Sequence, residues 1–308
     1  MSAPSSILIV GAGELGEAIL SALATHPARP ASTKFAVLLR PESINTSSPS
    51  KQTANERLRS LGATLVAGNF VEDEISSLAA TFSDYDIVIQ AGGYGLPAGT
   101  QMKSATTALQ AKVPRYFPWQ FGVDYEAIGK GSAQDLFDEM LQVRQLLRSQ
   151  STTKWTVIST GLFMSYLFLP EFGVVDLKDK TVRALGSWEN QVTVTTPEDI
   201  GRLTAEMVFV PEGTLDQVVY IGGETISYGR VADTVDEIMQ DKFTREEWTL
   251  AFLKERLSKN PDNLWYKYQC IFGDGTGIWW DGSKTLNNQR DMEMTTVKDY
   301  IAATFVQT

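Results

Sequence analysis

The chain has 308 residues, of which 43% are hydrophobic and 21% charged, and its formal net charge is −10 at pH 7. These values are ordinary for a soluble globular protein and exclude a disordered, collagenous or fibrous chain. The length suffices for one large domain or two unequal ones. Nucleic-acid affinity depends on basic groups that displace counterions from phosphates, so the acidic balance argues against a nucleic-acid partner.

The cysteine content and the N-terminal residues indicate in which cellular compartment the protein is expected. The one cysteine, Cys270, cannot form an internal disulfide, and no set of thiolates has the spacing of a metal site. The apolar run Ile7–Val10 is too short for a signal or membrane segment, and no basic segment precedes it. We therefore expect a cytoplasmic protein without a metal or a membrane anchor, and either a monomer or a homodimer.

Short β-branched runs alternate with longer amphipathic stretches through the first half of the chain. This rhythm is typical of an α/β fold in which helices cover both faces of a doubly wound parallel sheet. In chain order we expect strand 7–10, helix 14–24, strand 35–39, a helix containing 56–61, strand 64–67, helix 75–82, strand 87–89, strand 115–117, helix 132–149 and strand 156–159.

Beyond Gly161 the alternation weakens, while tryptophan and tyrosine become more frequent. We interpret residues 1–160 as the sheet domain and 161–308 as mainly a smaller, substrate-binding domain. Segments near 188–201 and 216–223 each contain a β-branched run, which we expect to return to the first sheet. The two domains are therefore predicted to be interleaved.

A glycine-rich turn joins the first predicted strand to the first predicted helix. Its residues are Gly11, Ala12, Gly13, Glu14, Leu15 and Gly16. In a G-x-G-x-x-G turn the first glycine permits a tight turn, the second lets the backbone approach a pyrophosphate, and the third lets helix and strand pack closely. The unpaired N–H groups of the helix N-terminus also favour phosphate. We expect this Rossmann turn to bind a dinucleotide; the alternative is a structural turn without a ligand.

The second predicted strand is followed directly by Arg40. An acid at this position usually holds the ribose 2′-hydroxyl of NAD, whereas a base meets the 2′-phosphate of NADP. Arg40 therefore predicts NADP(H), with Lys51 as a second cation and Glu42 as an opposing charge. The alternative is a solvated arginine at a strand end.

Several stretches resemble the NmrA-like, isoflavone reductase-like group of atypical short-chain dehydrogenases. The similarity covers most of the first 200 residues and rests on 7–16, 38–41, 62–69, Gln101 and, most specifically, 115–124. It implies an NADPH-dependent oxidoreductase, typical of secondary metabolism. Besides the glycine-rich turn, Arg40 and Lys51, we expect further residues to bind the cofactor. They are Asn69, Gly92, Phe117, Pro118, Gln120, Thr160, Gly161 and Phe163.

The catalytic lysine of these reductases is absent. The family pattern Phe-x-x-Lys-x-x-Val-Arg corresponds here to 137–144, with Met140 at the lysine position. A thioether cannot usefully donate or accept a proton, so the usual mechanism does not carry over. Tyr166 and Lys130 are the remaining candidates, although simple packing and a solvated loop lysine are the ordinary interpretations. Tyr94 is a further phenol near the expected pocket.

A substrate site is expected beside the cofactor. Trp119, which replaces a family serine, is assigned to it together with Met140, Tyr166 and Trp279. Further aromatic residues that could stack on a flat ring are Trp265, Tyr266, Tyr268 and Trp280.

Three functions remain open. The first is an NADPH-dependent reductase of an aromatic or polyketide-like small molecule. The second is a non-redox isomerase or cyclase of a phenolic substrate on the same fold, which Met140 favours. The third is an NADP-sensing regulatory protein without catalysis.

Overall fold

The computed structural model describes residues 4–93 and 95–306. The chain divides into two compact units. The first comprises Met1–Gln120, Glu139–Ile158 and Ile200–Val219, and the second Phe121–Asp138, Ser159–Asp199 and Tyr220–Thr308. Each unit is thus assembled from three separate stretches of the chain.

The first unit is built on a seven-stranded sheet in the order β11-β6-β5-β4-β1-β2-β3. The strands are β1 (Ser6–Val10), β2 (Lys34–Leu39), β3 (Ala63–Ala67), β4 (Ile87–Gln90), β5 (Arg115–Phe117), β6 (Lys154–Ser159) and β11 (Gln217–Tyr220). From β3 through to β6 every neighbouring pair is parallel. The chain leaves β1 toward β2 on one side and later returns to β4 on the other, which confirms the doubly wound Rossmann class.

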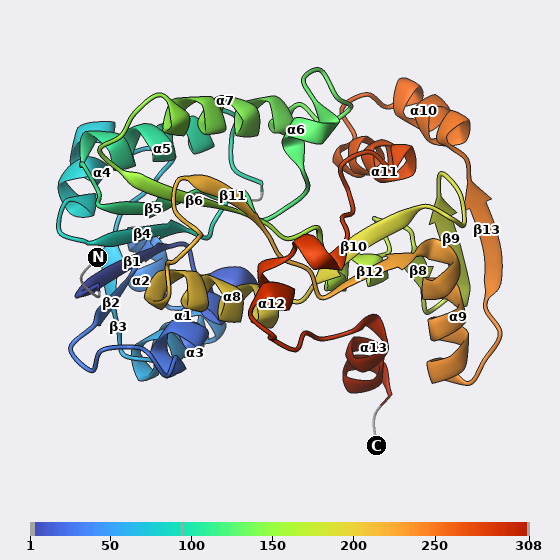
Figure 1. Cartoon of the computed structure of the whole chain (residues 1–308), viewed down its shortest axis with the longest axis horizontal. Helices are drawn as coiled ribbons and strands as arrows, with labels where there is room; N and C mark the ends of the chain where they lie inside the picture. Colours follow the sequence, from blue (N-terminus) through green and yellow to red (C-terminus); the bar gives the residue numbers. More distant parts are fainter. Residues whose placement is uncertain (1–3, 94, 307–308) are drawn as a thin grey trace. The chain divides into compact units, whose positions relative to one another are not determined.

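Helices cover both faces of this sheet (Figure 1). The helices α4 (Ile75–Phe82), α5 (Thr100–Gln110) and α7 (Leu136–Arg148) lie on one face, while α1 (Glu14–Thr25), α3 (Pro49–Ser60) and α8 (Pro197–Phe209) lie on the other. A short helix, α2 (Pro41–Ile44), follows β2. Leu8, Val88 and Val157 of the strands pack with Phe82 and Leu147 of the helices in one buried core.

The second unit contains two three-stranded sheets. One has the order β12-β10-β7 and the other β13-β9-β8. Their strands are β7 (Leu162–Phe163), β8 (Val175–Asp176), β9 (Thr181–Leu185), β10 (Gln191–Thr195), β12 (Glu224–Ser227) and β13 (Thr244–Trp248).

The helices of the second unit have from 3 to 12 residues. They are α6 (Tyr125–Ile128), η1 (Met164–Phe168), α9 (Tyr228–Met239), α10 (Leu250–Lys259), α11 (Leu264–Asp274), η2 (Gly282–Lys284), α12 (Leu286–Gln289) and α13 (Val297–Phe305). Within residues 4–93 and 95–306, none of the helices has the length and apolar character needed to cross a bilayer.

The placement of one predicted strand is wrong. Residues 191–195 do form a strand, β10, but it pairs with β7 and β12 and not with the first sheet. Val192 and Val194 are fully buried there. An alternating strand specifies that one face is buried, but not which sheet buries it. The other returning segment contains β11, which lies beside β6 in the seven-stranded sheet.

Candidate functional site

A cavity of about 550 Å³ lies at the carboxyl ends of β1, β2 and β4 in the first unit. In an open α/β sheet this edge, where the strand order reverses, is the usual ligand site. The lining residues are Val10, Gly11, Ala12, Leu38, Leu39, Arg40, Ser43, Gly68, Asn69, Phe70, Val71, Gln90, Gly92, Gly93, Gly95 and Leu96.

The first and third glycines of the turn are required by the packing of the chain itself. Gly11 has φ +93°, and a Cβ there would lie 3.0 Å from the Gly92 Cα. A Cβ on Gly16 would lie 2.2 Å from the Gly11 carbonyl oxygen. Only glycine fits either position without moving backbone.

The second glycine is different, because no protein atom requires it. Gly13 has φ −74°, and a Cβ built on it meets nothing within 4 Å. Gly13 is also the N-cap of α1, and it has no side chain that could cap the first turn. Open space beside the N-terminus of a helix is the arrangement that a dinucleotide phosphate requires, so the residues present fit that group.

Arg40 lies on the cavity wall immediately after β2. Its Nε is 3.4 Å from Glu42 Oε1, and the two side chains are 62% and 61% exposed. An ion pair this exposed is weak and can exchange for a ligand phosphate. Lys51, on α3, is exposed and does not line the cavity.

Asn69 and Gly92 also line the cavity. The Asn69 Nδ2 donates to Glu72 at 3.0 Å, and its Oδ1 accepts from the Val71 N–H at 3.0 Å. The Gly92 N–H donates to the Val10 carbonyl at 2.8 Å. Of the turn residues, only Gly11 and Ala12 line the cavity; Glu14 is exposed and Leu15 is buried in the core.

The segment after β5 is mostly buried. Phe117, Pro118 and Gln120 are inaccessible. The Gln120 amide donates to the Met140 carbonyl at 2.9 Å, and its Oε1 accepts from Arg144 Nε at 2.8 Å. The Gln120 side chain is therefore committed to contacts within the protein.

Met140 and Trp119 lie in different environments within the first unit. The Met140 side chain is fully buried in α7. Trp119 is partly exposed, and its indole lies on Gly93, where a Cβ would come within 2.1 Å of the ring. Trp119 thus packs on a residue of the cavity wall, whereas Met140 is enclosed by protein.

The remaining predicted cofactor residues belong to the second unit. Gly161 has φ +73°, and a Cβ there would lie 2.0 Å from the Thr193 carbonyl oxygen. The Thr160 carbonyl accepts from Thr195 Oγ1 at 2.6 Å. The conformation of this loop is thus fixed by β10. The Phe163 ring lies 5.8 Å from that of Tyr166.

The catalytic and aromatic candidates of the second unit are only partly brought together. Tyr166 lies 6.1 Å from Trp265, which lies 6.4 Å from Tyr268, measured between ring centroids. By contrast, Lys130 is exposed in a loop and Trp279 is 46% exposed. Tyr94 is outside the described residues.

Two other aromatic candidates have structural contacts. The Arg256 guanidinium lies 4.2 Å from the centre of the Tyr266 ring. Trp280 is buried, and its Nε1 donates to the Ile221 carbonyl at 3.1 Å.

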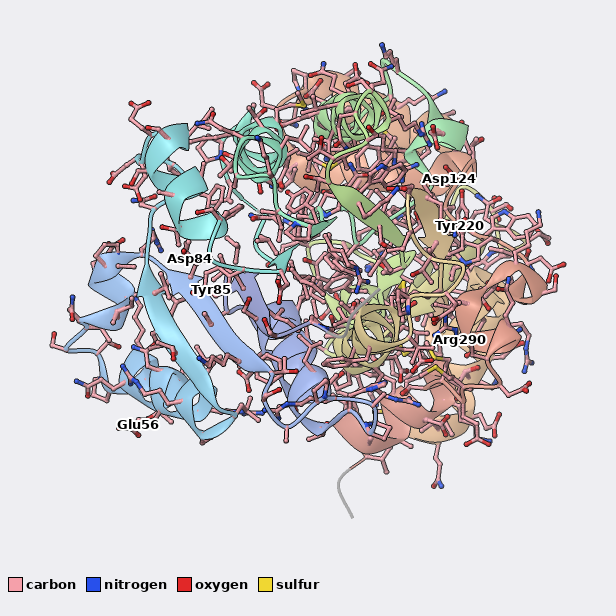
Figure 2. The ribbon with its side chains drawn as sticks, turned by 60° about the vertical axis from the view of Figure 1, so that its left-hand side comes forward. Glu56, Asp84, Tyr85, Asp124, Tyr220 and Arg290 are labelled. Atoms are coloured by element: carbon pink, nitrogen blue, oxygen red, sulfur yellow. The ribbon has the colours of Figure 1, made fainter. Side chains whose placement is uncertain are left out.

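Sequence reasoning missed a contact that fixes the end of the 115–124 stretch. The Tyr220 hydroxyl donates to Asp124 Oδ2 at 2.8 Å, and Figure 2 shows the two labelled residues close together. The other oxygen, Oδ1, accepts from the Glu126 and Ala127 N–H groups and so caps α6. No sequence spacing links residues 96 positions apart, so only the tertiary structure could show this pair.

Gln90 is a second residue that sequence reasoning missed. It ends β4, is 1% exposed and lines the cavity. The available signal was a polar residue directly after the apolar run Ile87–Ile89, at the sheet edge where ligands bind.

Comparison with known proteins decides the family. The sequence profile of the NmrA-like family matches residues 3–301. The chain belongs to the NmrA-like family. An NmrA-like family domain-containing oxidoreductase of Gibberella moniliformis is 50% identical over 297 residues, which is 96% of this chain and 97% of the relative. This confirms the resemblance given by the 7–16 and 115–124 stretches.

Solved structures of similar fold span nearly the whole NmrA-like chain. A binary complex of leucoanthocyanidin reductase and NADPH from Vitis vinifera has a TM-score of 0.82 at 21% identity and covers 98% of this chain and 100% of that one. AtPrR2 with NADP⁺ and (+)-pinoresinol has a TM-score of 0.78 at 18% identity, covering 98% and 99%. At these identities the likeness shows the fold.

Proposed function

We propose that this protein is an NADPH-dependent reductase of a small aromatic or polyketide-like molecule. The observation that carries the proposal is the open space at Gly13, beside the N-terminus of α1, in a family whose 50%-identical member is an oxidoreductase. The fold neighbours solved with NADPH and with NADP⁺ support the same cofactor.

Residues of the cavity and residues next to it have distinct parts in this proposal. The turn at Gly11 and Gly13 and the first N–H groups of α1 bind the pyrophosphate. Arg40, released from Glu42, binds the 2′-phosphate through paired N–H donors. When bound, the nicotinamide supplies a hydride. Trp119, which packs on the cavity residue Gly93, bounds the space for substrate.

The proton step cannot use the position at which the family has a lysine. Met140 is fully buried and has no ionisable group. Tyr166 Oη is the proposed donor, in an aromatic cluster with Trp265 and Tyr268 that offers stacking surfaces to a ring-bearing substrate. The Phe163 ring also lies 5.8 Å from the Tyr166 ring. Replacement of Tyr166 by Phe should therefore lower kcat more than it raises KM.

The cofactor is tested by titrating NADPH and NADH into the wild type and into Arg40→Gln. We expect the wild type to prefer NADPH by about 100-fold, and the variant to lose most of that preference, because one charge-assisted phosphate contact is worth about 1.5–3 kcal/mol. Arg59→Gln, on the exposed face of α3, is the matched charge control. Equal or weaker binding of NADPH would contradict the assignment.

The reaction is tested separately with NADPH deuterated at nicotinamide C4 and a panel of aromatic ketones, enones and benzylic ethers. Deuterium in the product, with loss of NADPH absorbance, supports a reductase.

The fully buried Met140 favours a second candidate, a non-redox isomerase or cyclase of a phenolic substrate. For that function, turnover continues without added nucleotide and no deuterium enters the product. The two candidates therefore give opposite results in the same assay.

A further inference from the structure

Three buried polar side chains form a chain of hydrogen bonds that ends on the cavity wall. The Tyr116 hydroxyl is 2.8 Å from Ser104 Oγ, which donates to Gln90 Oε1 at 3.0 Å. The Gln90 Nε2 then donates to the Gly92 carbonyl at 2.7 Å. The three side chains are 1%, 0% and 1% exposed.

The donor and acceptor of each hydrogen bond in this series are fixed. A serine hydroxyl has one proton, and Ser104 gives it to Gln90, so Tyr116 is the donor to Ser104. Burial raises the pKa of the Tyr116 phenol, although the Ser104 contact opposes that rise, and the phenol stays protonated. The Gln90 amide is thus held with its oxygen toward Ser104 and its NH₂ toward Gly92.

The Gln90 end of this series of hydrogen bonds fixes the Gly92–Gly93 peptide, which would otherwise rotate easily. Gly92 and Gly93 both line the cavity, and two successive glycines give a backbone with few steric limits. In a planar trans peptide the carbonyl and the next N–H point to opposite sides. Because Gln90 holds the Gly92 carbonyl, the Gly93 N–H is directed away from Gln90. In the part of the chain that the structure describes, this N–H has no protein acceptor.

We propose that Gln90 is a positioning residue of the cofactor site: by holding the Gly92 carbonyl on its own amide, it presents the Gly93 N–H to the bound dinucleotide. The inference rests on the proposed function, in which this cavity binds NADPH. Without the Gln90 contact the Gly92–Gly93 peptide can rotate so that its carbonyl takes the place of the N–H, and a carbonyl oxygen repels phosphate oxygens.

The test is a fluorescence titration of NADPH into the full-length wild type and three variants. Gln90→Met keeps the side-chain length but removes the donor, and its Kd for NADPH should rise about tenfold. Tyr116→Phe is the matched control. It removes a buried hydroxyl from the same chain but leaves Ser104 free to donate to Gln90, so its Kd should stay within about twofold of wild type.

Gln90→Glu supplies a readout that a purely structural role would not move. A carboxylate cannot donate to the Gly92 carbonyl, whereas a protonated carboxyl can. The ratio of the variant Kd to the wild-type Kd should therefore fall as the pH is lowered from about 8 to about 5.5, since burial raises a carboxyl pKa into this range. Taking the ratio cancels titration of the nucleotide itself.

The results distinguish a failure of the Gln90 role from a failure of NADPH binding itself. Wild-type affinity in both Gln90→Met and Gln90→Glu, with folding verified by thermal melting, overturns the role of Gln90 alone. A wild type that binds no NADPH overturns the proposed function and this inference with it. Equal weakening by Gln90→Met and Tyr116→Phe would assign the effect to core packing, and would also overturn the positioning role.

Discussion

Gly16 is required by the packing of the protein itself, whereas Gly13 leaves space for a ligand. Substitutions should distinguish these two roles. Gly13→Val places a side chain in open space at φ −74°, so the free energy of unfolding should change by less than about 1 kcal/mol, while NADPH affinity falls at least about tenfold. Gly16→Ala, the matched control, clashes with the Gly11 carbonyl and should cost about 2 kcal/mol or more. Chemical denaturation and NADPH titration check both; retained affinity in Gly13→Val would contradict ligand approach at Gly13.

Two buried tyrosines form a second matched pair. Tyr116 has a hydroxyl partner in Ser104, whereas the Tyr228 hydroxyl is buried without a partner among the described residues. Tyr116→Phe should lower the free energy of unfolding by about 1 kcal/mol, and Tyr228→Phe should leave it unchanged or raise it by up to about 1 kcal/mol, because a lone buried hydroxyl only costs desolvation. Urea denaturation measures both. A loss of about 1 kcal/mol in Tyr228→Phe would reveal a partner, such as a bound water.

At the level of single residues, the sequence predicted which residues lie at the sheet edge better than it predicted what their side chains contact. It predicted Arg40 and Gly92 at the sheet edge, and both line the cavity. It also assigned Gln120 to the cofactor, a role that stays a prediction, but the side chain is held by Met140 and Arg144. Strand order is enough to predict that a residue lies at an edge, whereas the rotamer depends on neighbours far away in sequence.

At the level of elements, the buried parallel strands were predicted to within two residues at each end. Strands buried on both faces are continuous apolar runs, which the sequence shows directly. Helix α5, rich in threonine and glutamine, has no such signal. Its N-terminus is capped from α7, because the Glu139 carboxylate accepts from the N–H groups of Gly99, Gln101 and Met102. A cap 40 residues away cannot be predicted from local pattern.

A buried arginine of the sheet stabilises the C-terminal end of α8. Arg115, buried on β5, donates from both terminal nitrogens to the carbonyls of Met207 and Val208 near the end of α8, each at 2.8 Å. Burial lowers the pKa of Arg115 to about 10, so it remains charged at neutral pH.

Removal of that side chain should leave two buried carbonyls unsatisfied. Arg115→Met should lower the free energy of unfolding by about 2–4 kcal/mol. The exposed Arg59→Met in α3 is the control and should change it by less than about 0.5 kcal/mol. Guanidinium denaturation measures both. An equally small effect in the two variants would show that water satisfies the α8 carbonyls.

At the level of the whole molecule, each unit has a buried or partly buried aspartate that ties the chain together. Burial alone would raise the pKa of Asp236, but bonds from the Phe243 N–H, Lys242 and Arg245 outweigh it and lower that pKa. In the first unit, burial likewise opposes the Ser5 and Ser6 bonds that lower the pKa of Asp86.

The sign of the pH dependence follows from these shifts. A carboxyl whose folded pKa lies below its unfolded value stabilises the fold above the unfolded pKa of about 4, and this contribution is lost as pH falls through the folded pKa. Asp236→Asn should therefore cost about 1 kcal/mol at pH 7, and the difference from wild type should shrink below about pH 4. Thermal melting from about pH 7 to about pH 3 measures it, with the exposed Asp262→Asn as control. A difference that is constant with pH would contradict the ionic cause.

The sequence by itself determined the Rossmann class, the strand–turn–helix that fits a dinucleotide, the base after β2 and the loss of the family lysine at Met140. Each of these depends on residues adjacent in the chain or on the period of buried strands. Tertiary structure alone decided which sheet β10 joins, that Gln120 is held inside the protein, and that Gln90 fixes the Gly92 carbonyl. Such contacts join residues that packing brings together, and a buried polar group takes whichever partner that packing supplies.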